Sequence, residues 1–287
     1  MKYIYTIYEY ETDKYYKLEI HEIINHIKNN PENTYYKILY DLKNKDDEKI
    51  LINKNIVLNT EFIAHRINTT AELEDIDKQF GVELDLRDDH KTGKLILSHD
   101  PFTDGEYFED YLKKYKHNTM ILNIKSERIE LECLKLIEKY ENSKNNNDSE
   151  NNNYENNKEN DKLKYFFLDS SFPMIYLLNK EYNNQNIACR FSEYEPINQF
   201  LEIRDKVKYL WVDCFTKFPL TPEIYKTIKP TEKLSKELDK YDIKICLVSP
   251  ELQKQSQKID EYREYIIENG IIPDMICCKI YNIINWI

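Results

Sequence analysis

Glycine is scarce in this sequence, with only four among 287 residues, at Gly81, Gly93, Gly105 and Gly270. They lie too far apart to form the glycine-rich loops that hold the phosphates of nucleotides and dinucleotides. The sequence therefore argues against P-loop motors and against dinucleotide-binding Rossmann proteins.

Paired cysteines, a signal peptide and long apolar runs are also missing. The six cysteines include no CxxC pair and most lie in apolar runs, so we expect buried free thiols in a reducing compartment rather than a zinc cluster. The first residues lack the apolar run of a signal peptide, and no stretch of about 18 apolar residues could span a membrane. We therefore expect a cytoplasmic protein with no stable membrane anchor.

Basic residues are outnumbered by acidic ones. Lysine and arginine total 41 against 52 aspartate and glutamate residues, which gives a formal net charge of −11. A protein that neutralises nucleic-acid phosphates needs a basic face, so we expect no nucleic-acid partner. Apolar residues make up 41% of the chain, enough for a packed core. The oligomeric state cannot be predicted from these data.

Short apolar runs alternate with longer amphipathic stretches from residue 61 onward. The apolar runs, which we expect to be strands, lie at 62–66, 82–86, 120–124, 165–168, 187–191, 209–213, 244–248 and 275–278. Expected helices lie between or after them at 70–79, 107–116, 127–140, 171–180, 193–204, 231–241 and 251–268. Eight strand–helix units of this length predict an α/β fold of the (β/α)₈ TIM-barrel type. A doubly wound open sheet is the alternative.

Two segments do not follow this alternation. Residues 1–57 contain tyrosine-rich runs at 3–10 and 35–40 around a helical pattern at 22–28, and we expect a small N-terminal α/β appendage on a barrel domain of residues 58–287. Residues 141–161 are about half asparagine with almost no apolar side chains. Such a segment cannot bury a core, so we expect a disordered insertion.

Polar side chains gather at the predicted carboxyl ends of the strands, where TIM barrels carry their active sites. The first strand ends in His65-Arg66, and the second carries Glu83 and Asp85. Side chains alternate along a strand, so both carboxylates lie on one face. If that face is the barrel interior, the pair suits a hard divalent cation such as Mg²⁺ or Ca²⁺.

Later strands add further polar groups to the same end. A short run ends in His99-Asp100, and the third barrel strand ends in Asn123-Ile-Lys125. Two histidines can act as acid and base near neutral pH, and cationic side chains with a metal can hold a phosphate. The set indicates phosphodiester cleavage. Arg190 and Asp213 end later strands and are candidate substrate contacts together with Lys125.

The segment FIAHRINTTAELEDIDKQFGVELDLRDDHKTGKLILSHDPF resembles the start of glycerophosphodiester phosphodiesterases, which are TIM barrels of the phospholipase-C-like superfamily. The resemblance lies in three ordered motifs, His65-Arg66, Glu83-x-Asp85 and His99-Asp100, and covers roughly residues 61–127. It implies His65 and His99 as acid and base, Arg66 and Lys125 as phosphate ligands, and Glu83, Asp85 and Asn123 as metal ligands. The implied partner is a small phosphodiester with a glycerol or sugar next to the phosphate.

The sequence departs from the family pattern in three places. Ile67 stands where the family usually has glycine, Asn123 stands where it has a third carboxylate, and the family's Asn-Thr element is not clearly present because Asn68-Thr69 comes too early. The loss of the glycine and of the third carboxylate leaves open a barrel that binds a phosphorylated ligand without cleaving it. A phosphoinositide-cleaving relative of the same superfamily is the other alternative.

Overall fold

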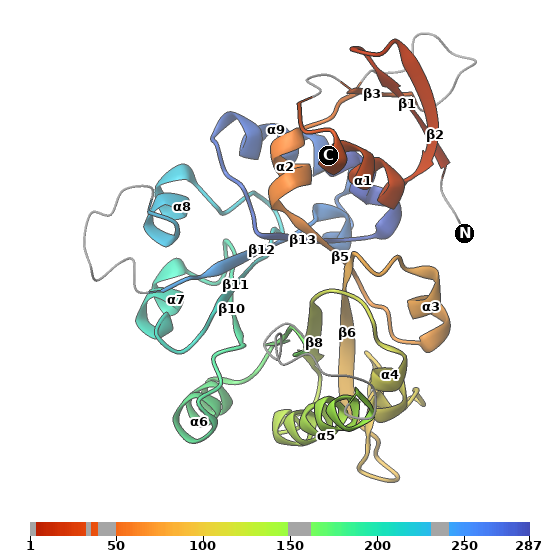
Figure 1. The fold of residues 1–287 in the computed structure, drawn as a ribbon. Helices are drawn as coiled ribbons and strands as arrows, with labels where there is room; N and C mark the ends of the chain where they lie inside the picture. The colour runs from red at the N-terminus through yellow and green to blue at the C-terminus, as the bar shows by residue number, and fades with distance from the viewer. Residues whose placement is uncertain (1–3, 33–35, 40–49, 149–161, 231–240) are drawn as a thin grey trace.

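The computed structural model describes residues 4–32, 36–39, 50–148, 162–230 and 241–287. Eight parallel strands form its central sheet (Figure 1). They are β5 (Glu61–Ala64), β6 (Gly81–Asp88), β8 (Met120–Ile124), β9 (Tyr165–Leu168), β10 (Ala188–Phe191), β11 (Tyr209–Val212), β12 (Lys244–Val248) and β13 (Met275–Cys278).

Spatial neighbours in this sheet are also neighbours in sequence. The strand order is β10-β11-β12-β13-β5-β6-β8-β9, and an isolated parallel bridge between Phe167 and Ile187 joins the two end strands. The sheet is therefore nearly closed, and its order does not reverse as it does in a doubly wound sheet. The α/β class and a barrel-like sheet that agrees with a TIM barrel are confirmed.

Helices surround the strands (Figure 1). They are α3 (Thr70–Asp75), α4 (Phe108–Lys114), α5 (Glu130–Asp148), α6 (Phe172–Tyr182), α7 (Ile197–Ile203), α8 (Pro222–Ile228), α9 (Ile259–Glu268) and α10 (Ile283–Trp286). Short 3₁₀ turns occur at Pro250–Gln253, Ser256–Lys258 and Ile280–Asn282. The short strand β7 (Leu95–Leu97) pairs antiparallel with the end of β6.

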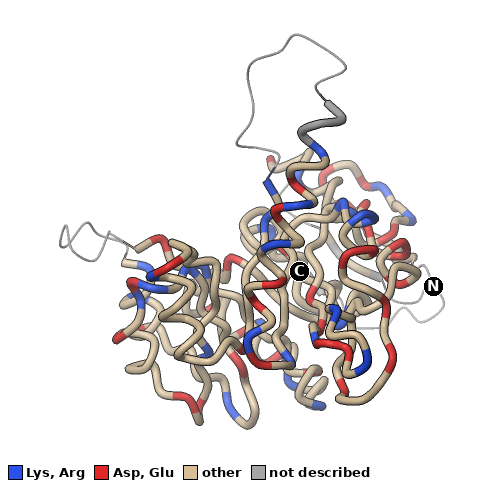
Figure 2. The backbone as a smooth tube through the Cα atoms, turned by 90° about the horizontal axis from the view of Figure 1, so that it is seen from below, with Lys and Arg blue, Asp and Glu red and all other residues tan. Residues whose placement is uncertain are grey.

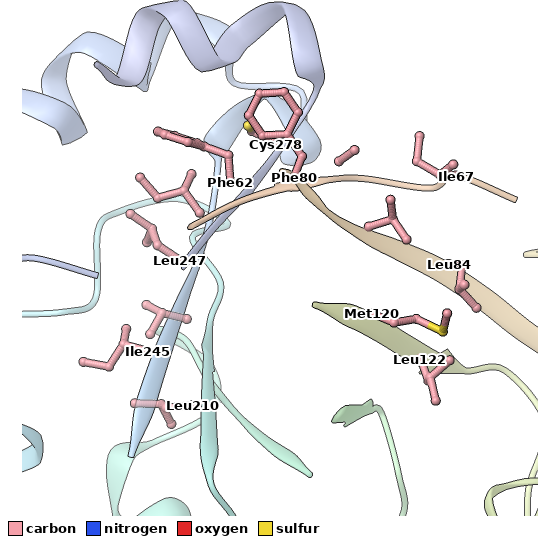
Figure 3. Packing of buried hydrophobic residues seen from close by; sticks show 14 of the residues in the cluster. Phe62, Ile67, Phe80, Leu84, Met120, Leu122, Leu210, Ile245, Leu247 and Cys278 are labelled. Carbon is pink, nitrogen blue, oxygen red and sulfur yellow. The ribbon is translucent and has the colours of Figure 1, made fainter. Parts of the chain in front are cut away.

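Apolar side chains pack on both faces of the barrel strands. Outward-facing residues such as Phe62, Leu84 and Leu122 belong to the large core beneath the helices (Figure 3). A second cluster, from alternate positions of the same strands, includes Ile121 and Phe166 and fills the interior. All six cysteines are buried free thiols, as predicted.

The N-terminal residues form a separate antiparallel sheet of order β2-β1-β3-β4. Its strands are β1 (Ile4–Glu9), β2 (Lys14–Glu19), β3 (Tyr36–Leu39) and β4 (Ile50–Leu51), and α1 (Ile20–Asn29) and α2 (Lys54–Asn59) accompany it. Helix α1 buries Ile23 and Ile27 in a cluster continuous with the barrel's outer core. The sequence predicted β1, β3 and α1 but missed β2 and β4.

One other prediction differs in part from the structure, and another falls on residues that the structure does not describe. Helix α5 continues to Asp148, so residues 141–148 of the predicted disordered insertion are helical; a helix that has already nucleated propagates at little cost per residue. The remainder, 149–161, lies outside the described residues. The helix predicted at 231–241 also lies almost wholly outside the described residues. The sequence analysis missed α8, which ends shortly before residue 231.

Charged residues of both signs are distributed over the described part of the chain (Figure 2). No helix among the described residues is long and apolar enough to cross a membrane.

Candidate functional site

A layer of polar side chains lies above the apolar interior of the barrel. Ile63, Ile121, Ala188, Trp211 and Cys277 belong to the interior cluster. Side chains alternate between the faces of a strand, so the residue two positions further along points inward as well. These next residues are His65, Asn123, Arg190, Asp213 and Lys279. The fold thus brings most of the predicted site residues to the carboxyl end of the barrel.

The acidic pair on β6 is completely buried. Glu83 and Asp85 have no solvent-exposed surface, whereas the intervening Leu84 belongs to the outer core. Glu83 accepts hydrogen bonds from the Arg66 backbone N–H at 2.8 Å and from Asn123 Nδ2 at 2.8 Å. The pair therefore faces the barrel interior, as the alternation predicted.

Asn68 is a site residue to which the sequence analysis assigned no role. Its Nδ2 donates to Asp85 Oδ2 at 2.9 Å, and its Oδ1 accepts from the Asp85 backbone N–H at 2.8 Å. This two-way contact fixes both the side chain and the backbone of Asp85. The adjacent Asn-Thr pair after His65-Arg66 was the available signal.

Arg66 occupies a strained backbone conformation that supports this arrangement. Its φ is 56°, in the left-handed region that non-glycine residues seldom adopt. In this turn the backbone N–H of Arg66 donates to the Glu83 carboxylate. The backbone N–H of the next residue, Ile67, donates to the Glu83 backbone carbonyl at 2.9 Å. The Arg66 side chain is partly exposed, with Nε 3.7 Å from Asp85 Oδ2. Its guanidinium is thus accessible at the mouth of the barrel.

His65 and Glu83 have strongly shifted pKa values. Burial, followed by the nearby charges of Lys279 and Arg66, lowers the pKa of His65 to about 3. Burial and the Asp85 charge raise the pKa of Glu83 to about 7. The contact between His65 Nε2 and Glu83 Oε2 at 3.7 Å is therefore not an ion pair at neutral pH, because the imidazole carries no charge.

Lys125 connects the acidic pair to the neighbouring strand. Its Nζ lies 3.6 Å from Asp85 Oδ1 and 3.4 Å from Asp169 Oδ2. Asp169 directly follows β9 and has a φ of 64°, and the sequence analysis missed it because the predicted strand ended at Leu168. Both carboxylates share one ammonium group, so part of the Lys125 charge is already compensated.

Arg190 is the centre of an ion-pair network on the other side of Asp169. It donates to Asp169 Oδ1 at 2.8 Å and to Asp213 Oδ2 at 2.6 Å, and its Nε lies 3.2 Å from Glu195 Oε1. Asp213 also accepts from Gln253 Nε2 at 2.9 Å. These contacts hold the ends of β9, β10 and β11 together.

His99 lies on the loop after β7. Its Nδ1 is 2.7 Å from Asp100 Oδ1, and its side chain is 42% exposed. The adjacent Ser98 N–H donates to the Asp85 carbonyl at 3.0 Å, which anchors this loop to β6. The charge of His99 is one of the causes that lower the pKa of His65, so the two histidines interact electrostatically.

The donor set of the predicted metal site consists of oxygen atoms. No group of three or more His, Cys, Asp or Glu side chains in the described residues could hold a metal ion, and the third predicted ligand is an amide, Asn123. Asp85 Oδ1 and Asn123 Oδ1 have no hydrogen-bond partner in the part of the chain that the structure describes, although Asp85 Oδ1 lies 3.6 Å from the Lys125 ammonium. A buried amide oxygen without a hydrogen-bond partner beside two carboxylates fits a hard cation.

Comparisons with known proteins give no identification. No protein-family model matches the chain, and no curated protein matches it.

Proposed function

We propose that this protein is a metal-assisted phosphodiester hydrolase that acts on a diester with a hydroxyl group next to the phosphate. The observation that carries this proposal is the buried pair Glu83 and Asp85, with His65 on one side and the accessible Arg66 guanidinium at the mouth. The resemblance of the three sequence motifs to glycerophosphodiester phosphodiesterases supports the same chemistry.

The two histidines take different roles in this proposal. Because the pKa of His65 is about 3, its ring is neutral at pH 7, which is the protonation state that the acceptor of the attacking hydroxyl's proton requires. His99 forms a hydrogen bond with Asp100 through Nδ1. In a protonated ring, the Nε2–H can therefore donate its proton to the leaving alkoxide oxygen. Arg66 and Lys125 bind the phosphoryl oxygens.

Glu83, Asp85 and Asn123 are the residues that would hold the divalent cation. When bound, the cation would neutralise charge that develops on the phosphoryl oxygens. Asn68 and the Arg66 N–H keep the two carboxylates in place through their hydrogen bonds. The intermediate expected from such an attack is a cyclic phosphate, which water then opens.

The proposal is tested by turnover of glycerophosphodiesters and of a chromogenic phosphodiester with Mg²⁺, Mn²⁺ or Ca²⁺ and with chelator. His65→Ala and His99→Ala should each lower kcat by roughly 10²-fold or more, the usual size of acid–base contributions. His90→Ala is a matched control, because His90 is also 42% exposed and lies near the same loop; it should retain activity.

The competing hypothesis is a barrel that binds a phosphorylated ligand without cleaving it. Two observations favour this hypothesis. Two carboxylates already compensate part of the Lys125 charge, and position 123 carries an amide. Binding of inorganic phosphate or a phosphomonoester, with no turnover of any diester under any of the three metals, would establish it and reject the hydrolase.

A further inference from the structure

A cavity of about 930 Å³ opens between α6 and α7, beside the carboxyl ends of β9 and β10. Its volume lies at the upper end of the range for small-molecule sites. Six of its lining residues carry apolar side chains: Phe172, Ile175, Tyr176, Ala188, Cys189 and Ile203. The other half of the lining is polar or charged and includes Glu202 and Lys206.

The cavity lies at the seam of the barrel. The other neighbouring strands of the sheet share ladders, whereas β9 and β10 are joined, among the described residues, only by the bridge from Phe167 to Ile187. In the part of the chain that the structure describes, no further backbone pairing joins the two strands, and their ends are linked by the side chains of Arg190 and Asp169. Ala188 on β10 is a small side chain that adds to the open space there.

The same cavity borders the candidate active site. Asp169 and Arg190 line its inner wall, and Asp169 contacts Lys125, which in turn contacts Asp85. A ligand whose phosphate lies at Lys125 would therefore have its substituent beside the cavity entrance. Asp169 and Arg190 satisfy each other through a 2.8 Å hydrogen bond, so they do not require a polar ligand in the cavity.

Exposed aromatic side chains surround this end of the barrel. Phe172 and Tyr176 are exposed on the first turns of α6, Phe102 on the loop after β7, and Tyr194 on the loop after β10. Phe102 adopts a φ of 61°. Of these four, Phe172 and Tyr176 line the cavity. Exposed large apolar groups at a pocket are typical of surfaces that receive apolar ligands.

We propose that this cavity, which we call the seam pocket, holds the hydrocarbon chain of a single-chain amphiphilic phosphodiester. The inference rests on the proposed hydrolase function and narrows its substrate class from small polar diesters to monoacyl or monoalkyl diesters. The six apolar side chains of the lining, on α6, β10 and α7, supply the chain site, and the Lys125–Asp169 contact puts it next to the proposed phosphate position.

The first test compares a glycerophosphodiester without a chain against monoacyl forms of increasing chain length, each below its critical micelle concentration. Burial of each CH₂ group is worth about 0.8 kcal/mol, so kcat/KM should rise by up to roughly fourfold per CH₂ until the seam pocket is full. Equal kcat/KM with and without the chain overturns the inference and leaves the hydrolase intact.

Variants of the pocket wall sharpen this test. Tyr176→Ser and Phe172→Ser should lower the ratio of kcat/KM between chain-bearing and chain-free diesters. Tyr182→Ser is the matched control, because Tyr182 lies on the same helix with nearly the same exposure, 52% against 51% for Tyr176, and does not line the pocket. An equal loss in the control would overturn the assignment of the chain to this pocket.

A binding measurement separates failure of the pocket from failure of the hydrolase. Calorimetric titration of the full chain with alkyl phosphates of increasing length should show affinity that rises with length and falls in Tyr176→Ser. Length-dependent binding without turnover of any diester keeps the pocket and rejects the enzyme. Absence of length dependence rejects the pocket. A preference for a chain-free diester with a quaternary ammonium head group also rejects it, because the cavity would then bind a cation rather than a hydrocarbon chain.

Discussion

Asn123 Nδ2 donates a 2.8 Å hydrogen bond to Glu83 Oε1, while its own Oδ1 has no hydrogen-bond partner among the described residues. The amide thus stabilises one carboxylate of the acidic pair and leaves one oxygen for a further ligand. If the proposed cation binds here, Asn123 would ligate it through Oδ1 without adding a third negative charge.

Replacing this amide by an isosteric carboxylate, Asn123→Asp, should lower stability without metal and raise affinity for Mg²⁺, Mn²⁺ and Ca²⁺. A third buried negative charge beside Glu83 and Asp85 is costly alone and favourable with a cation. Thermal unfolding with chelator and with each metal measures both effects. Asn282→Asp, another buried asparagine, should not gain metal affinity. An unchanged metal titration would remove position 123 from the site.

The pH dependence of stability should report on Glu83. Its pKa rises from an ordinary 4.5 to about 7 in the folded chain, through burial and the Asp85 charge. The folded state therefore binds more protons than the unfolded state between these values, and its stability falls as pH rises through that window. In the metal-free protein, Glu83→Gln should gain stability relative to the wild type from pH 4.5 to 8, on the order of 2–3 kcal/mol.

Glu61 provides a matched control for this measurement. Burial also raises its pKa, but it lies at the opposite end of the barrel, where it accepts hydrogen bonds from Thr119. Glu61→Gln should show a pH trend of the same sign, yet divalent cations should stabilise this variant as much as the wild type. In Glu83→Gln they should stabilise less. Equal metal responses in both variants would contradict a cation at Glu83.

His65 should give the opposite pH trend. Its pKa falls from 6.5 to about 3 on folding, chiefly through burial, so the unfolded state binds more protons between these values. Stability is then lost as pH falls through this window. In His65→Asn, the urea-unfolding midpoint should fall less steeply with decreasing pH than it does in the wild type. In His90→Asn, a change at an exposed histidine, the midpoint should fall as steeply as in the wild type. A wild-type slope in His65→Asn would mean that His65 is charged in the folded chain.

The sequence predicted the parts of the site that depend on strand periodicity. His65, Glu83, Asp85, Asn123 and Lys125 end or occupy strands, and a period of two residues places them on one face. The missed contacts depend on the turns after the strands. Asn68 reaches Asp85 through the left-handed turn at Arg66, which no glycine marks in the sequence.

Other errors had signals that the sequence contained. Helix α8 begins with Thr221 as N-cap and Pro222 in the first turn, a recognised helix start. The helical part of the asparagine-rich segment had no such signal, because its composition favours a loop and only the preceding helix sustains it. The pocket at the seam could not be predicted, since it depends on how far the consecutive strands β9 and β10 pair where the sheet closes.

Arg190→Met should destabilise the fold through the carboxylates that it leaves behind. Arg190 contacts Asp169, Asp213 and Glu195, and Asp213 is buried with a pKa already raised by burial. Loss of the only cation that pairs with Asp213 among the described residues should cost about 2–3 kcal/mol in urea unfolding at pH 7. Lys206→Met, which breaks a more exposed pair with Asp205, should cost less than about 1 kcal/mol.

The double variant Arg190→Met/Asp213→Asn decides whether the buried charge is the cause. If the cost arises from an unpaired carboxylate at Asp213, removing that charge should recover part of the lost stability, because a neutral amide can still accept the Gln253 hydrogen bond. Lowering the pH should recover stability in the single variant as well, since protonation of Asp213 removes the same charge. Additive losses in the double variant would instead show that Arg190 stabilises the barrel by packing its side chain, independently of Asp213.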